Sequence, residues 1–254
     1  MPLYYEYAPD SRLQNLVETY WVSKGYIDTP VTQRIMPDGC VDIIFDFEEN
    51  CITRPRSQGQ PDIVGTMSSY FDISYSPGHT YKLGIRFNPA GITAFTRVPV
   101  HEFTNLSTDL MLTDTLFDNA FHEQMPELES TEARLAHINR YLLSRLPHTY
   151  QPEQRIVHAI DLITGSKGQF SIGRLSEEVC LCQRQFERRF KDAVGISAKV
   201  FSRVIRFRYT QQYMKQHPNE SVYSAALSCG YHDDSHLAKE FRQLGGVVPK
   251  SIHG

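Results

Sequence analysis

Two pairs of side chains in this sequence have the chemistry to bind a metal ion, and one of the pairs also has the spacing. His232 and His236 lie four residues apart, so they share one face of a helix, and two aspartates follow His232 directly. Cys180 and Cys182 are separated by one residue, whereas zinc sites space their cysteines by about two to four. The alternative for the cysteines is ordinary packing, because a free cysteine behaves as a small apolar residue.

A third pair, Asp38 and Asp42, could supply two carboxylates for acid–base chemistry. The run Pro37-Asp38-Gly39 favours a turn role for Asp38, and Asp42 falls on the polar face of a strand. The sequence has no phosphate-binding glycine loop, no nucleophile elbow and no His-x-His pair, since His79 and His101 are isolated. We therefore expect no catalytic residue, metal or cofactor. A cupin-like small-molecule-binding protein or metal-dependent enzyme fused to a helical domain is the alternative.

The last hundred residues contain an internal repeat. The run Phe186–Lys191 is followed four residues later by a glycine, Gly195, and the similar run Leu237–Arg242, shifted by 51 residues, is followed by Gly246. Around each run we expect two helices joined by a tight turn: 172–179 with 183–194, and 222–229 with 234–243. A long helix over 198–216 should join the two units. With the same shift of 51 residues, Val179 pairs with Gly230.

Helix-turn-helix units of this kind bury an apolar stripe and present the second helix to a DNA major groove about 12 Å wide. The exposed positions of the two second helices are our predicted base-reading residues: Arg184, Glu187 and Arg188 in the first, and Asp234, Ser235, His236 and Lys239 in the second. Four further cations are better placed for phosphates: Arg189, Lys191, Arg203 and Arg242.

The distribution of charge agrees with DNA binding at one end of the chain. Residues 1–149 contain 11 Lys+Arg and 19 Asp+Glu, a net charge of −8, whereas residues 150–254 contain 15 and 10, a net charge of +5. A basic half joined to an acidic half suggests that only the second half contacts nucleic acid.

Residues 170–252 resemble the DNA-binding domain of the AraC-type transcription regulators of bacteria. The matching positions are Leu175, Phe186, Arg188, Phe190, Gly195, Arg206, Ala226, Gly230, Tyr231, Leu237, Phe241, Gly246 and Pro249. The resemblance implies two helix-turn-helix motifs, places His236 on the DNA-facing side, and puts Cys180 and Cys182 in the first turn, which favours packing over metal binding.

The sequence departs from this family pattern at several positions. Ser176 and Ala198 replace a usual alanine and a common proline, and Cys182 replaces a serine that would cap the helix better. Asp233 and Asp234 favour the positive end of the second recognition helix but would face phosphates. We therefore expect the second unit to contribute less affinity than the first.

The first half is rich in short β-type runs, at 40–47, 63–67, 71–75 and 81–87, with a helix expected at 11–22. The runs Met36–Phe45 and Leu83–Gly91 are similar to the N-terminal domain found in a subset of AraC-type regulators, over residues 3–115. The resemblance implies a cupin-like barrel. The fold class is therefore α+β: a β-rich barrel with flanking helices, followed by an all-helical domain.

Two features of residues 1–149 bear on regulation. Five aromatic residues either line an effector pocket or fill the barrel: Tyr70, Phe71, Tyr75, Tyr81 and Phe87. A helix over 131–146 carries the stripe Leu135, Ile138 and Leu142, which is either a dimer seam or a face docked on its own domain.

We place the domain boundary between residues 149 and 150, giving a regulatory or dimerisation domain and a DNA-binding domain. The expected partners are double-stranded DNA, RNA polymerase, a small-molecule effector and a second copy of the chain. The first residues lack the pattern of a signal peptide, no apolar run approaches the roughly 20 residues of a membrane span, and the five cysteines are an odd number. These features predict a cytoplasmic protein.

Overall fold

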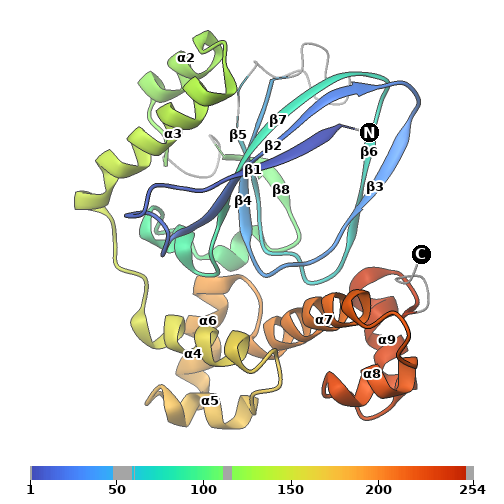
Figure 1. The fold of residues 1–254 in the computed structure, drawn as a ribbon. Helices are drawn as coiled ribbons and strands as arrows, with labels where there is room; N and C mark the ends of the chain where they lie inside the picture. Colours follow the sequence, from blue (N-terminus) through green and yellow to red (C-terminus); the bar gives the residue numbers. More distant parts are fainter. Residues whose placement is uncertain (1, 48–58, 60, 111–115, 250–254) are drawn as a thin grey trace.

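The computed structural model describes residues 2–47, 59, 61–110 and 116–249. A strand-rich region comes first and a helical region follows, as the fold class predicted. Figure 1 shows the strands above helices α4 to α9, with the chain descending along one side from α3 to α4.

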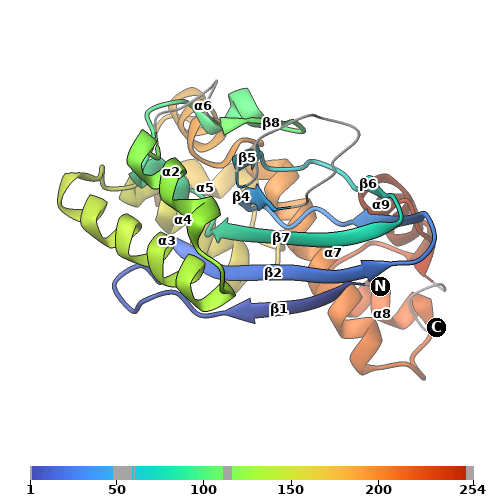
Figure 2. The same ribbon diagram turned by 90° about the horizontal axis from the view of Figure 1, so that it is seen from above.

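The strand-rich region has eight described strands, and every pairing is antiparallel. One sheet has the order β1-β2-β7-β4-β5-β8, and β3 and β6 form a separate two-stranded ribbon. The strands are β1 (Leu3–Tyr7), β2 (Val17–Ile27), β3 (Val31–Ile35), β4 (Val41–Asp46), β5 (Pro61–Val64), β6 (Phe71–Tyr75), β7 (Gly78–Phe87) and β8 (Ser107–Asp109). Figure 2 shows β1, β2 and β7 side by side in this sheet.

The alternation of β4 explains the two faces of the sheet. Val41, Ile43 and Phe45 are buried, whereas Asp42 and the other alternate residues are only partly so. Successive side chains of a strand point to opposite faces. The apolar face packs on α2 (Asn119–Glu127) and α3 (Thr131–Arg145) in one core, and the polar face looks away from them.

The prediction of a helix at residues 11–22 is wrong. Val17 bonds back to Leu13 in a short turn, and from Val17 the chain becomes β2, pairing with β1 on one side and β7 on the other. The apolar spacing of this segment fits a helix. Two neighbouring strands, however, satisfy its backbone groups, and tertiary pairing overrides local periodicity.

The helical region has its own core, and its helices match the predicted spans closely. They are α4 (Gln154–Gly165), α5 (Ile172–Glu178), α6 (Gln183–Val194), α7 (Ala198–Gln216), α8 (Val222–Ser228) and α9 (Asp234–Gly245). Three short 3₁₀ turns lie earlier: η1 (Gly91–Ala94), η2 (Val100–Phe103) and η3 (Leu146–His148). The predicted boundary at 149/150 falls in the connection between η3 and α4 and stays a prediction.

The stripe on α3 faces its own domain. Ile138 and Leu142 are fully buried in the core beneath the sheet, and Leu135 packs partly buried at its edge. A fully buried side chain offers no surface to a partner. The structure therefore favours docking over the dimer seam.

Candidate nucleic-acid interface and ligand cavity

Two helix-turn-helix units lie at the two ends of α7. In the first, α5 turns into α6 through Cys180, whose φ is +52°, and Leu181 N–H donates to Ser176 O at 2.9 Å. In the second, α8 turns into α9 through Gly230 at φ +77°, and Tyr231 N–H donates to Ala226 O at 2.9 Å. The two units therefore use the same turn.

The turn corrects one detail of the repeat. The residue structurally equivalent to Gly230 is Cys180, a shift of 50, whereas the following helices keep the shift of 51. The second loop therefore contains one extra residue before its recognition helix. The shift of 51 residues pairs Val179 with Gly230. It fails at this position because it holds for the recognition helices but not for the loops before them.

The two recognition helices begin differently. Asp233 caps α9, since its side chain accepts from His236 N–H at 2.7 Å. At the start of α6, Cys182 makes no side-chain cap hydrogen bond, as the sequence predicted. An uncapped first turn leaves backbone N–H groups without a side-chain acceptor.

The predicted base-reading residues lie on the outer faces of α6 and α9. Six of the seven are exposed: Arg184, Glu187, Arg188, Asp234, Ser235 and Lys239. His236 is half-buried, with its ring edge-on to Tyr231 at 5.3 Å. The residues that hold each helix down, Phe186 with Phe190 and Leu237 with Phe241, are buried on the opposite side.

The four predicted phosphate contacts divide into two kinds. Lys191 and Arg242 are exposed. Arg189 is ion-paired with Glu153 at 2.6 Å. Arg203 is drawn inward, because its Nε lies 2.9 Å from the carboxylate of Glu240, whose side chain is only 9% exposed. That ion pair counts against a phosphate role for Arg203.

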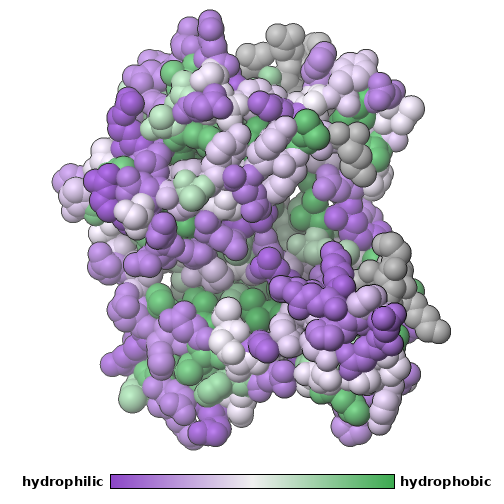
Figure 3. Space-filling model, in the orientation of Figure 1, coloured by the Kyte–Doolittle hydropathy of each residue, from purple (hydrophilic) through white to green (hydrophobic). Residues whose placement is uncertain are grey.

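The polar face of the sheet lines a cavity of about 1100 Å³, and residues of the β3–β6 ribbon also line it. Figure 3 shows a hollow near the middle of the viewed side of the molecule. Phe71, Tyr75 and Tyr81 of the predicted aromatic set line the cavity, but Tyr70 and Phe87 do not. Phe87 is buried in the core on the apolar face, and Tyr70 stacks beneath the Arg34 guanidinium at 4.1 Å.

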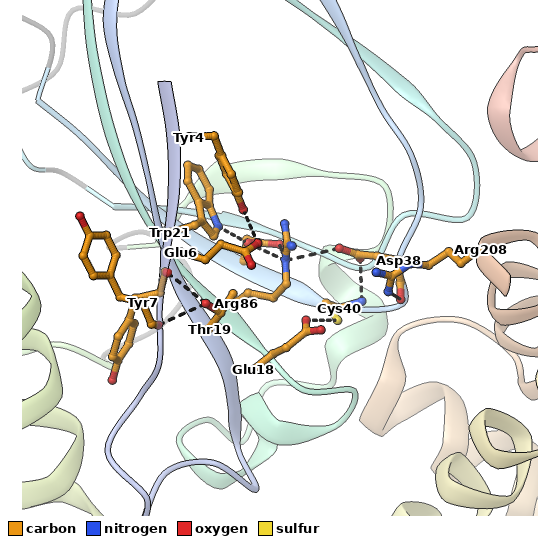
Figure 4. Close-up of polar contacts among 12 residues, drawn as sticks. Tyr4, Glu6, Tyr7, Glu18, Thr19, Trp21, Asp38, Cys40, Arg86 and Arg208 are labelled. Atoms are coloured by element: carbon orange, nitrogen blue, oxygen red, sulfur yellow. Dashed lines mark hydrogen bonds and ion pairs between the residues drawn. The ribbon is translucent and has the colours of Figure 1, made fainter. Parts of the chain in front are cut away.

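A charged cluster forms one wall of this cavity. Asp42 accepts from Trp21 Nε1 at 2.6 Å and lies 3.3 Å from Arg86 Nε, which is also 3.4 Å from Asp38. Asp42 lies on β4, and Figure 4 shows Trp21 of β2, Arg86 of β7 and Asp38 of the loop before β4 close together. Burial raises the pKa of Asp42 to about 6, with Arg86 opposing the shift. Two carboxylates therefore share one guanidinium.

Neighbouring residues explain how this cluster is built. Gly84 leaves room for the Trp21 indole, since a Cβ at this glycine would lie 2.0 Å from the ring. Cys40 N–H donates to Asp38 Oδ1 at 2.9 Å, which confirms the predicted turn role of Asp38. Burial and nearby carboxylates raise the pKa of the Cys40 thiol. Sequence reasoning missed Trp21 and Arg86, although Arg86 falls in the quoted run 83–91.

The predicted metal alternatives receive no support from geometry. The His232 side chain is 91% exposed, with its Nδ1 3.4 Å from Asp233, and His236 Nδ1 accepts from the His232 backbone N–H at 3.5 Å. Within the described part of the chain, no three His, Cys, Asp or Glu side chains come together as a metal site would require. None of the described helices is both long and apolar enough for a membrane span.

Comparison with known proteins adds two domain matches. Residues 175–253 match the sequence profile of a helix-turn-helix domain, and residues 5–109 match that of a domain of unknown function. Residues 250–253 of the first match lie outside the described structure.

The curated relatives are regulators of transcription. The HTH-type transcriptional regulator MtrA of Neisseria gonorrhoeae is 30% identical over 98 residues, which is 38% of this chain and 32% of MtrA. The HTH-type transcriptional regulator ArgR of Pseudomonas aeruginosa is 28% identical over 76 residues, 30% of this chain and 23% of ArgR. The matched part is thus a third or less of each relative's length.

Among solved structures, ToxT of Vibrio cholerae aligns over 100% of this chain and 97% of its own, with a TM-score of 0.43 and 11% identity. ToxT with a bound unsaturated fatty acid aligns with a TM-score of 0.40 and 13% identity.

Proposed function

We propose that this chain, which carries an AraC-type helix-turn-helix domain at its C-terminus, regulates transcription by reading two adjacent major-groove segments of DNA. The observation that carries the proposal is the pair of matching helix-turn-helix units on one continuous helix. Helix α7 has 19 residues, so at 1.5 Å per residue it is about 28 Å long. A span near one DNA turn of about 34 Å lets one chain address neighbouring grooves.

The proposal assigns base contacts to the exposed residues of α6 and α9, and general affinity to Lys191 and Arg242. Residues 150–254 then form the DNA-binding domain, and residues 1–149 the regulatory domain. Pairing of two chains and contact with RNA polymerase stay predictions from the sequence.

Selection of bound sites from random duplexes tests the two-segment proposal. Arg188→Ala should relax base preference in one segment, at a cost of about 1–3 kcal/mol, and Lys239→Ala should do so, by less, in the other. Arg242→Ala should weaken all sequences alike and lower the salt slope by about one. Arg12→Ala is the matched control, because Arg12 is exposed on the strand-rich region. The proposal fails if Arg188→Ala and Lys239→Ala change the same base positions.

We further propose that the cavity binds a small effector that is uncharged or cationic. Its lining contains five aspartates and two strong bases: Asp38, Asp42, Asp46, Asp62 and Asp72, with Lys82 and Arg86. Arg86 and Lys82 already face carboxylates, Asp42 and Asp46 respectively. An entering anion would meet unfavourable charge, whereas a cation with an apolar body would meet carboxylates and aromatic rings.

A thermal-shift comparison of benzyltrimethylammonium with 3-phenylpropanoate on the full chain tests the charge preference. The cation should raise the melting temperature and the anion should not. Ile44→Trp is the matched variant, because Ile44 lines the cavity and a larger side chain would fill part of it. A shift with the anion alone would contradict the assignment, as would a cation shift of equal size in Ile44→Trp.

A further inference from the structure

One short segment of the strand-rich region touches the C-terminal ends of both recognition helices. It is residues 65–70, here called the strap, and it joins β5 to β6. Its residue Thr66 contacts the end of α6, and its residue Tyr70 contacts the end of α9.

At the end of α6, two threonines satisfy carbonyl groups that the helix leaves unpaired. The buried Thr66 donates its Oγ1 to Val194 O at 2.6 Å, and Thr104 donates its Oγ1 to Gly195 O at 2.7 Å. Gly195 has φ +93°, and a Cβ there would lie 3.1 Å from both threonines. The last carbonyls of a helix need such partners.

The C-terminal end of α9 is held in a similar way to that of α6. Tyr70 N–H donates to Leu244 O at 2.8 Å, and Arg34 Nη1 donates to Gly246 O at 2.9 Å. Asp72 holds the guanidinium by two hydrogen bonds of 2.8 and 2.9 Å, so that its remaining nitrogen faces the helix end. A cation is favourable at the C-terminal end of a helix.

The strap is itself held in place. Gly65 packs so tightly that a Cβ would lie 1.9 Å from Phe103 O, and its N–H donates to Leu106 O at 3.0 Å. Asn105 accepts from both the N–H and the hydroxyl of Ser68, at 2.8 and 3.1 Å. A segment fixed in this way can transmit its position to both helices.

These contacts leave the DNA-facing ends free. They engage the C-terminal ends of α6 and α9, whereas Arg184, Arg188 and Ser235 are exposed nearer the N-terminal ends. In helix-turn-helix proteins, the N-terminal residues of the recognition helix contact the base edges.

We propose that the strap, with Arg34 and Thr104, positions the two recognition helices relative to each other and so sets the spacing of the DNA segments that the chain reads. Thr66 and Arg34 are positioning residues, one for each helix. The inference rests on the two-segment function proposed above. The strap is also part of the cavity wall, through Gly65 and Met67, so a molecule in the cavity lies against the positioning element.

The test measures the affinity of the full chain for duplexes in which the two selected segments are moved apart or together by one or two base pairs. Wild type should lose about tenfold or more per base pair, because one helix leaves its base edges. The double variant Thr66→Val/Arg34→Met removes one donor from each contact. It should discriminate among spacings by only about threefold and bind the original site less tightly, because its helices are less preorganised.

Two controls separate positioning from general damage. Thr32→Val/Arg12→Met makes the same chemical changes on exposed residues of the strand-rich region and should keep the wild-type spacing profile. Thr66→Ser keeps the hydroxyl donor and should also keep the wild-type spacing profile. If the double variant does not fold, Arg34→Met alone, at a partly exposed site, should still flatten the profile.

The outcomes distinguish the two proposals. An unchanged spacing profile in the folded variants overturns the strap inference while leaving two-segment reading intact. A wild type that selects only one segment overturns both.

Discussion

The aspartate in the cavity wall makes a definite prediction about stability and pH. Burial raises the pKa of Asp42 from 3.8 to about 6, with Arg86 and the Trp21 N–H pulling the other way and Asp38 adding to the rise. Its side chain is 13% exposed, so solvent screens this shift little. The folded protein therefore holds a proton on Asp42 more tightly than the unfolded chain does.

The sign of the effect follows from linkage. For an acid whose folded pKa is raised, stability falls as the pH rises from the unfolded pKa to the folded pKa, and is then level. With these two pKa values, the free energy of unfolding should fall by about 1.4 kcal/mol between pH 5 and pH 7.5. For a chain of this size that corresponds to about 3–6 °C in melting temperature.

Comparison with Asp42→Asn isolates this contribution. The asparagine keeps an acceptor for Trp21 but does not titrate. Burial lowers the pKa of His122 and of His137, and these groups act in the opposite direction over the same range, so only the difference between the two proteins is informative.

Urea unfolding of wild type and variant at pH 5, 6, 7 and 7.5 provides the measurement. Wild type should lose about 1.4 kcal/mol relative to the variant across this range. Parallel curves would refute the reasoning. A wild type that gains stability relative to the variant as the pH rises would show that the charge of Arg86, not burial, controls Asp42.

Four further substitutions test packing and capping. Gly39 has φ +84°, and Gly39→Ala places a Cβ 2.5 Å from the ring of Phe201 on α7, so this variant should lower the free energy of unfolding by about 1–3 kcal/mol. Gly165→Ala meets open space at the end of α4 and should leave stability unchanged or raise it by up to about 1 kcal/mol; equal urea midpoints for these two variants would contradict the packing argument. Cys182→Ser should add the missing cap of α6 and raise the free energy of unfolding by about 0.5–1 kcal/mol, and no gain in urea unfolding would mean that the hydroxyl does not reach an N–H. Ile138→Asp should unfold the strand-rich region or destabilise it by more than about 3 kcal/mol, whereas a folded variant of halved mass by light scattering would restore the dimer seam.

The sequence determined the helical region almost completely. The spans of α6 and α7, the turn at Gly230 and the weak cap at Cys182 all followed from it. These features are local, because helical periodicity, capping and a left-handed turn residue each depend on a few neighbouring residues. The exposure of Arg188 followed for the same reason, since it lies opposite a buried aromatic stripe.

The strand-rich region was predictable only as a class. Its runs of β-type residues agree with the strands, but residues 17–22 of the expected helix belong to β2, and two of the five aromatics predicted for the pocket lie elsewhere. The face on which a strand residue lies depends on register against partners far along the chain. Phe87, for example, pairs with Val41 and falls on the core face.

Only the tertiary structure decided the contacts between distant segments. Asp42, Arg86 and Trp21 meet because β4 and β2 flank β7, and no spacing within the sequence encodes that order. Likewise Arg34 reaches Gly246 across 212 residues. The sequence showed Gly195 and Gly246 as a repeat and so as two helix ends. The fold alone brings the strap to both of them, because strand pairing and interior packing fix where a loop lies relative to a helix.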